Sequence, residues 1–90
     1  MAWSVNYTDT AQAQLDKLPR DVASRILSYL EDRAATAPAS PRQYGEPLHG
    51  PLSGLWRYRI GDYRAICELR DEALVILVIK IAHRREVYRQ

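Results

Sequence analysis

The sequence predicts a small α+β domain, because helical periodicity is confined to its first third and strand-like alternation dominates its second half. Residues 10–30 carry apolar side chains three and four positions apart. Residues 55–82 contain three apolar runs separated by short turn signals, and a further alternating segment lies at residues 3–7. The expected order is β-α-α-β-β-β, an antiparallel-rich sheet with two N-terminal helices packed on one face and a short basic C-terminal tail. Residues 1–90 are expected to form a single domain, because this length supports one modest core.

Side-chain spacing predicts the first strand and both helices. Residues 3–7 alternate apolar and polar, as in a strand with one face on the core. Thr8-Asp9-Thr10 supplies cap oxygens for a first helix over about residues 10–17. Pro19 suits the first turn of a second helix, because its missing N–H leaves no bond unmade there. The apolar stripe of this second helix indicates about four turns packed on the sheet, and it consists of Val22, Ile26 and Leu30, joined by Ala23 and Leu27.

The character of the chain changes between residues 34 and 54. Four of the five prolines and three of the four glycines lie in this segment, which is typical of a loop. So long a loop in a compact domain favours a binding role. Leu48 and Leu52 are expected to pin it to the body of the protein.

Three strands are expected to follow the loop in a tight meander. They lie at residues 55–60, 63–69 and 73–82, divided by a Gly61-Asp62 turn and a polar break at residues 70–72. The last run is almost continuously apolar, which predicts a central strand with both faces covered. In the first strand, alternation places Arg57 and Arg59 side by side on one face.

The composition argues against a membrane protein, a disulfide-bonded protein and a metal-binding protein. No segment approaches the roughly 18 uncharged apolar residues of a membrane helix, and the N-terminus does not resemble a leader, so we expect a cytoplasmic protein without membrane contact. Cys67 has no second cysteine to pair with and reads as a small buried hydrophobe. Two histidines and one cysteine, without clustered carboxylates, do not make a metal site, so no metal or cofactor is expected.

The positive charge lies mainly in the second half of the chain. The net charge is only +2, yet residues 57–90 carry eight Lys or Arg against five acids, whereas residues 1–56 carry five against six. Arg57, Arg59 and Arg64 are expected to meet His83 and Arg84 in one concave anionic-ligand site. Guanidinium groups suit phosphate because they present paired donors and keep their charge.

Groups that move protons or stack on bases accompany these arginines. Histidine can give or take a proton near neutral pH, which suits His83 to acid–base work. Tyr63 and Tyr88 can stack on a base of a single strand. Phosphate transfer from an RNA 2′-hydroxyl needs such parts and no metal. An exposed arginine on a strand is also commonly part of a solvated face, and Tyr88 alone is commonly a packing contact.

GPLSGLWRYRIGDYRAICEL, followed by an apolar strand and IAHRREVYR, resembles the RelE/ParE superfamily of toxins from toxin–antitoxin pairs, and the RelE branch in particular. The resemblance covers nearly the whole chain. It implies a toxin of a type II system that cuts mRNA in the ribosomal A site, without metal, by attack of the 2′-hydroxyl on the adjacent phosphate. It also implies a cognate antitoxin that covers the basic surface, with a heterotetramer as one possible assembly.

The resemblance assigns roles to matching positions. Arg64 resembles the arginine that steadies the scissile phosphate, and Arg84 the basic residue that supports the leaving oxygen, with Arg85 as the alternative in that place. Tyr88 resembles the C-terminal tyrosine that stacks on or orients the nucleotide, and His83 a general acid or base. The resemblance also implies that Arg57 and Arg59 bind phosphate or ribosomal RNA. Tyr63, through stacking, and Arg85 complete the expected substrate-binding positions. Relatives carry lysines where Arg57 and Arg59 stand. Because arginine cannot release a proton near pH 7, it cannot serve as the base, and His83 or Tyr88 must take a larger part in proton transfer if this protein cuts RNA.

Two further functions remain open at the level of sequence. A ParE-like protein would share the fold and inhibit DNA gyrase by binding, without catalysis. A degenerate toxin would bind only its antitoxin or serve in a repressor complex. The H-R-R-x-x-Y tail favours the nuclease, because a gyrase inhibitor needs neither an acid, a base nor a base-stacking tyrosine.

Overall fold

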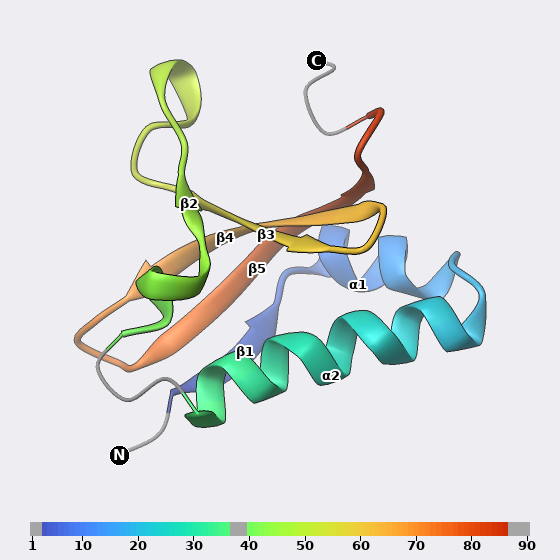
Figure 1. The fold of residues 1–90 in the computed structure, drawn as a ribbon, viewed down its shortest axis with the longest axis horizontal. Helices are drawn as coiled ribbons and strands as arrows, with labels where there is room; N and C mark the ends of the chain where they lie inside the picture. Colours follow the sequence, from blue (N-terminus) through green and yellow to red (C-terminus); the bar gives the residue numbers. More distant parts are fainter. Residues whose placement is uncertain (1–2, 37–39, 87–90) are drawn as a thin grey trace.

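A computed structural model, which describes residues 3–36 and 40–86, shows two helices against one face of a five-stranded sheet (Figure 1). The strand order is β1-β5-β4-β3-β2; β1 runs parallel to β5, and the other neighbours are antiparallel. The elements are β1 (Ser4–Tyr7), α1 (Asp9–Asp16), α2 (Arg20–Thr36), β2 (Glu46–Pro47), β3 (Trp56–Ile60), β4 (Tyr63–Arg70) and β5 (Val75–His83), with 3₁₀ helices η1 (Pro41–Tyr44) and η2 (Gly50–Leu52). The predicted α+β class with helices on one face is confirmed.

The first helix begins where the sequence places its cap. The Thr8 hydroxyl accepts a hydrogen bond from the Ala11 N–H at 3.1 Å, and it donates one to the Ile79 carbonyl at 2.9 Å. The cap therefore satisfies a free backbone donor and also ties α1 to β5. The second helix, α2, is longer than the four turns expected, since it continues through Ala34, which is buried.

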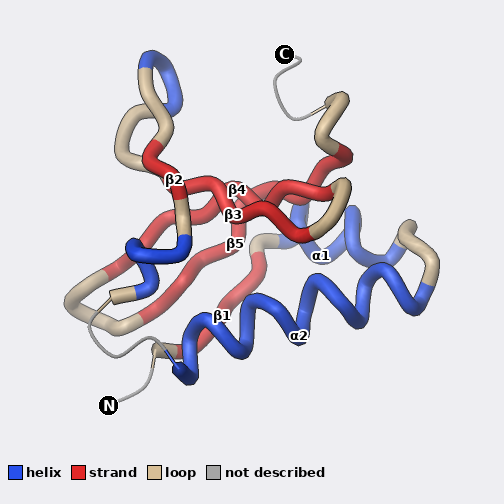
Figure 2. The backbone as a smooth tube through the Cα atoms, viewed as in Figure 1, coloured by secondary structure: helices blue, strands red, loops and turns tan. Residues whose placement is uncertain are grey.

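Both helices cover the same face of the sheet, which we call the helix face (Figure 2). The buried core between the two layers consists of Trp3, Ala11, Leu15, Ile26, Leu30, Ala34, Tyr58, Ile60, Ala65, Cys67, Leu69, Ile76, Val78 and Ile81. Burial raises the pKa of the Cys67 thiol well above its ordinary value, so this side chain acts as the buried hydrophobe expected. In the described part of the chain, no helix is long and apolar enough to cross a membrane.

The last strand differs from its prediction. β5 lies between β1 and β4, as expected for a central strand. On the face opposite the helix face, Val75, Leu77 and Ile79 are half-buried, and only Ala82 near the end of the strand is buried there. No helix covers the opposite face, which we call the outer face, within the described residues. The expectation of a strand covered on both faces is therefore wrong.

A β-bulge interrupts the pairing of β4 with β5. Ile66 pairs with Lys80 and its neighbour Cys67 pairs with Val78, which leaves Ile79 as an extra residue. Since side chains alternate along a strand, one extra residue exchanges the two faces for everything beyond it. Ile81 consequently lies in the main core, and Ala82 lies on the outer face.

The segment predicted to be a loop contains defined structure. Residues 40–47, which we call the strap, form η1 and the short edge strand β2. Inside the core, the Tyr58 hydroxyl donates a hydrogen bond of 2.8 Å to the Pro41 carbonyl. This bond holds the strap. Gly45 lies against the Tyr58 ring so closely that a Cβ there would be 3.1 Å from it. Leu48, just after the strap, packs with Leu55 on Ile66 and Ala82, as expected for a pinning residue.

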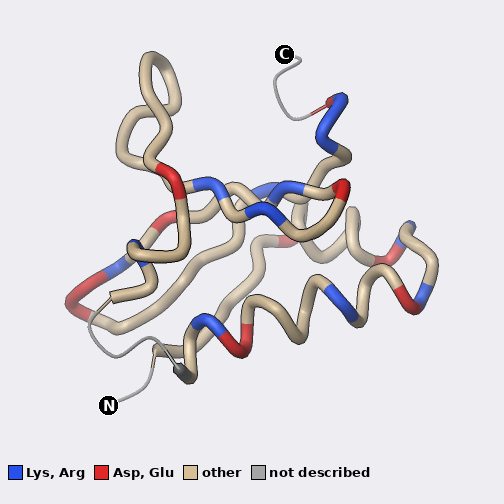
Figure 3. The backbone as a smooth tube through the Cα atoms, in the orientation of Figure 1, with Lys and Arg blue, Asp and Glu red and all other residues tan. Residues whose placement is uncertain are grey.

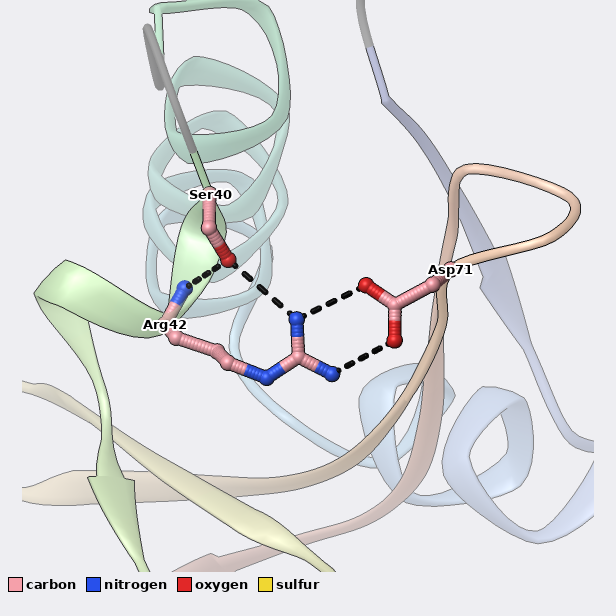
Figure 4. A network of polar contacts seen from close by, with 3 residues as sticks. All are labelled: Ser40, Arg42 and Asp71. Atoms are coloured by element: carbon pink, nitrogen blue, oxygen red, sulfur yellow. Dashed lines mark hydrogen bonds and ion pairs between the residues drawn. The ribbon is translucent and has the colours of Figure 1, made fainter.

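An arginine clamps the strap to the tip of the β4–β5 hairpin (Figure 4). The Arg42 guanidinium donates two hydrogen bonds of 2.8 Å to the Asp71 carboxylate and one of 3.3 Å to the Ser40 hydroxyl. It also lies over the Trp56 ring, 5.7 Å from its centre. A planar guanidinium is suited to such a paired contact. The clamp fixes the strap relative to the sheet, and with it the position of Glu46.

Candidate phosphate-binding site

The outer face carries a row of arginines at one end of the sheet. Arg57 and Arg59 share this face of β3, as the alternation predicted. Arg59 pairs directly with Arg64 of β4. Figure 3 shows basic positions along β3, β4 and the segment after β5. Like charges directly opposite each other destabilise a sheet, so this pairing favours the binding of an anion between them.

These arginines line a cavity of about 460 Å³, which we call the arginine cavity. Within the described residues its lining consists of Glu46, Arg57, Arg59, Arg64, Arg84 and Arg85. The structure thus brings together all five arginines that were singled out as site candidates. Five guanidinium groups around one cavity can bind a phosphate from several sides with charge-assisted hydrogen bonds.

Arg64 is the most deeply placed of the five. The residue is 9% exposed, and its guanidinium donates hydrogen bonds to the Gly61 and Tyr63 carbonyls at 2.9 and 2.8 Å. These contacts fix the side chain in the turn between β3 and β4. Burial, with the positive charges of Arg59, Arg57 and Arg84, lowers the pKa of Arg64, yet an arginine remains protonated near neutral pH. A bound phosphate would offset this accumulated charge.

Glu46 of the strap is a lining residue that the sequence did not indicate. It pairs with Arg57 across β2 and β3, and its carboxylate accepts hydrogen bonds from Arg57 at 2.7 and 3.2 Å. Hydrogen bonding by Arg57, then the charges of Arg57, Arg59 and Arg64, lower the pKa of Glu46. The sequence shows only that Glu46 is an acid in a long loop ahead of a basic strand. That position does not reveal which arginine it contacts. Glu46 is the one proton-accepting side chain among the described residues that line this cavity.

Arg84 is held beside the turn that precedes Arg64. Its backbone N–H donates to the Asp62 carbonyl at 2.7 Å, and its guanidinium lies 3.8 Å from the Asp62 carboxylate. Arg84 and Arg85 are both exposed and follow directly after β5. Because of the bulge in β5, Ala82 and Arg84 lie on the side of Arg64 rather than beneath the sheet.

Tyr63 and His83 do not line the arginine cavity. They pair across β4 and β5, and their rings meet edge to face with centres 5.4 Å apart. They line a second cavity of about 300 Å³, beside the end of α1, which we call the aromatic cavity. Its lining consists of Gln14, Lys17, Leu18, Tyr63, Lys80, Ile81, Ala82, His83 and Glu86. The expected convergence of His83 with the arginines is therefore not seen, because the bulge turns it to the helix face.

Tyr88 lies outside the described residues, so its role stays a prediction. The described residues contain no group of three or more His, Cys, Asp or Glu side chains placed to hold a metal ion. The two cavities therefore define the candidate site: a strongly cationic one on the outer face and an aromatic one at the same end of the sheet.

Comparison with known proteins identifies the family. The sequence profile of the ParE toxin of the type II toxin–antitoxin system parDE matches residues 5–88. Toxin RelG of Mycobacterium tuberculosis is 28% identical over 90 residues, all of both chains, and Toxin RelE of the same organism is 31% identical over 87 residues, 97% of this chain and 87% of that one.

Solved structures agree with the sequence relatives. A chain of the toxin–antitoxin complex RelBE2 from M. tuberculosis superposes with a TM-score of 0.83 at 26% identity, covering 96% of this chain and 95% of that one. A chain of the archaeal RelE–RelB complex from Pyrococcus horikoshii OT3 shares the fold, with a TM-score of 0.70 at 24% identity, over 97% of this chain and 100% of that one. The chain belongs to the RelE/ParE superfamily, the toxins of type II toxin–antitoxin systems.

Proposed function

We propose that this toxin is a ribosome-dependent endoribonuclease that cuts mRNA in the ribosomal A site. The observation that carries the proposal is the arginine cavity, where five guanidinium groups and one carboxylate surround a space of about 460 Å³. RNA presents one phosphate per nucleotide, and a cavity of this charge is suited to hold one. The toxins RelE and RelG of M. tuberculosis, which are similar over nearly the whole chain, support the RelE-like assignment.

The proposed reaction is transfer of the phosphate to the neighbouring ribose oxygen. The 2′-oxygen forms a bond to phosphorus, the bond from phosphorus to the 5′-oxygen breaks, and a 2′,3′-cyclic phosphate and a 5′-hydroxyl result. Arg64, fixed by two carbonyls, steadies the scissile phosphate, and Arg84 supports the leaving 5′-oxygen. Arg57, Arg59 and Arg85 bind flanking phosphates or ribosomal RNA. Their positive charges favour the dianionic transition state over the monoanionic substrate.

This reaction also needs one group that takes the 2′-hydroxyl proton and one that protonates the leaving oxygen. We assign the first role to Glu46, because it is the carboxylate in the arginine cavity and arginines cannot accept a proton. We assign the second to His83, which directly precedes Arg84 but lies on the other face of the sheet, so the RNA strand must pass around the end of β5 for its leaving oxygen to meet the imidazole. Tyr88 and Tyr63 are proposed to hold the bases of the substrate by stacking.

The partner proposed for the free toxin is a cognate antitoxin that covers the arginine cavity. Relatives were solved in toxin–antitoxin complexes, among them RelBE2 of M. tuberculosis and the RelE–RelB pair of P. horikoshii. An acidic segment of the antitoxin would neutralise the arginines as RNA does, and so would exclude the substrate. A heterotetramer of two toxins and two antitoxins is one assembly consistent with such pairs.

A second candidate function is inhibition of DNA gyrase by binding alone. The matching family profile is that of the ParE toxin, and this match covers residues 5–88. In that case the arginine cavity would be a docking surface for an acidic part of its target, and no residue would act on a phosphate.

The experiment that separates the two functions induces the toxin without its antitoxin in bacterial cells and maps mRNA 5′ ends, beside a supercoiling assay of gyrase. The nuclease gives cleavage in phase with codons that disappears when translation initiation is blocked, while gyrase keeps its activity. Intact messages with inhibited gyrase would instead establish the binding protein and overturn the catalytic roles assigned above.

A further inference from the structure

The aromatic cavity lies at the same end of the sheet as the arginine cavity but on the other face. Tyr63 directly precedes Arg64 in β4, and His83 directly precedes Arg84 after β5. Neighbouring residues of a strand point to opposite faces. Each strand end therefore supplies one aromatic side chain to the aromatic cavity and one arginine to the arginine cavity.

The lining of the aromatic cavity is chemically distinct from that of its neighbour. The Tyr63 and His83 rings meet at 81°, edge to face, and Leu18 and Ile81 supply apolar surface. The Gln14 side-chain oxygen accepts the Ile81 N–H at 2.6 Å, so its amide nitrogen remains as a donor at the cavity wall. Flat apolar surface with a few fixed hydrogen-bonding groups is what a heterocyclic base requires.

Lys17 gives the aromatic cavity one positive side chain. Glu86 is also in its lining, whereas Lys80 pairs with Ile66 across β4 and β5, so the Lys80 ammonium group belongs to the outer face. Lys17 is exposed and follows the last turn of α1, where a positive charge is favoured by the helix. An ammonium group beside an aromatic wall is the combination by which proteins hold single strands, with stacking for the base and positive charge for the backbone.

From this geometry we infer that the aromatic cavity is a base-binding subsite for the RNA nucleotide next to the phosphate held in the arginine cavity. This inference rests on the proposed function, which supplies the RNA strand. It extends the substrate site across the end of the sheet to α1, an element without a role in the proposed reaction. It also gives Tyr63 and His83 a shared binding role in addition to the proton transfer assigned to His83.

The test uses the free toxin with two small probes that differ only in the base, adenosine 5′-monophosphate and ribose 5-phosphate. Backbone NMR signals of Tyr63, Ile81 and His83 should move with the nucleotide and not with the sugar phosphate. Signals of Arg57 and Arg59 should move with both. The nucleotide should bind at least about fivefold tighter, because stacking of one base contributes about 1–3 kcal/mol. Equal affinities, or movement of the arginine signals alone, would overturn the inference.

A charge-matched pair of variants gives a second, independent test. Lys17→Glu and Arg20→Glu make the same change of net charge at exposed positions three residues apart, and only Lys17 lines the cavity. Lys17→Glu should weaken binding of a short oligoribonucleotide about tenfold, whereas Arg20→Glu should change it less than about threefold. Equal losses would contradict a local contact. Because both tests use free protein, nucleotide binding without cleavage of ribosome-bound mRNA would refute the proposed nuclease and support this subsite.

Discussion

Replacement of Tyr58 by Phe should loosen the strap, because it removes one buried hydrogen bond and changes little else. The Tyr58 side chain is fully buried, and its hydroxyl donates to the Pro41 carbonyl at 2.8 Å. The variant leaves this buried carbonyl without its donor, which costs about 1–3 kcal/mol. For a chain of 90 residues, each kcal/mol lost from the free energy of unfolding lowers the melting temperature by roughly 4–8 °C.

Urea unfolding, followed by tryptophan fluorescence, measures this loss. With a slope of about 1 kcal/mol per molar urea for a small domain, the midpoint should fall by roughly 1–3 M. Tyr44→Phe is the matched control: the Tyr44 ring lies against the Arg33 guanidinium at 4.5 Å, its side chain is 39% exposed, and the same atom is removed. The control should stay within about 0.5 kcal/mol of the natural protein. Equal midpoints for the two variants would refute the assignment of this hydrogen bond to holding the strap.

Three further outcomes are expected. Arg64→Ala and Tyr88→Ala should each abolish growth arrest while antitoxin binding persists in a pull-down, and retained toxicity in both would refute their assignment to the site. Glu46→Gln should slow mRNA cleavage by at least about 100-fold if its carboxylate takes the proton, whereas Glu68→Gln, which alters an acid on the same face outside the cavity, should not. Hydrogen bonding by its arginine partner lowers the pKa of Asp71, so the clamp contributes stability above the ordinary aspartate pKa of about 3.9 and loses it as pH falls through the lower folded value. Asp71→Asn should therefore reduce the urea midpoint at pH 7, and its difference from the natural protein should shrink as the pH falls below the ordinary aspartate pKa; a difference that stays constant would contradict the ion pair.

The fold could be predicted because its main elements follow local rules. Alternation on β3, the cap at Thr8 and the apolar stripe of α2 are each readable within a few residues. The strap was not predicted, because its Pro- and Gly-rich sequence has no periodicity of its own. Its structure depends on tertiary contacts, such as the bidentate pair between Arg42 and Asp71, which are 29 residues apart in sequence.

The candidate site was predicted only where it follows from local rules. Arg57 and Arg59 share a face through simple alternation, and Arg64 follows from the short hairpin that joins β3 to β4. His83 was expected beside them, but the bulge at Ile79 shifts the alternation of β5 by one residue and places His83 with Tyr63. The sequence signal for the bulge is Lys80, because simple alternation from Ile76 and Val78 would place it in the core, whereas the bulge places it opposite Ile66 on the outer face. The apolar residues around it suit either face and do not locate the bulge.

The most direct test of the central claim is cleavage of a defined mRNA on purified ribosomes with an open A site. Arg59→Ala removes a guanidinium from the arginine cavity, and Arg70→Ala removes one from the same face of the sheet outside the cavity. We expect rapid cleavage by the natural protein and by Arg70→Ala, and cleavage slowed at least about tenfold in Arg59→Ala. Equal rates for the two variants, or intact mRNA with the natural protein, would contradict a nuclease site in the arginine cavity.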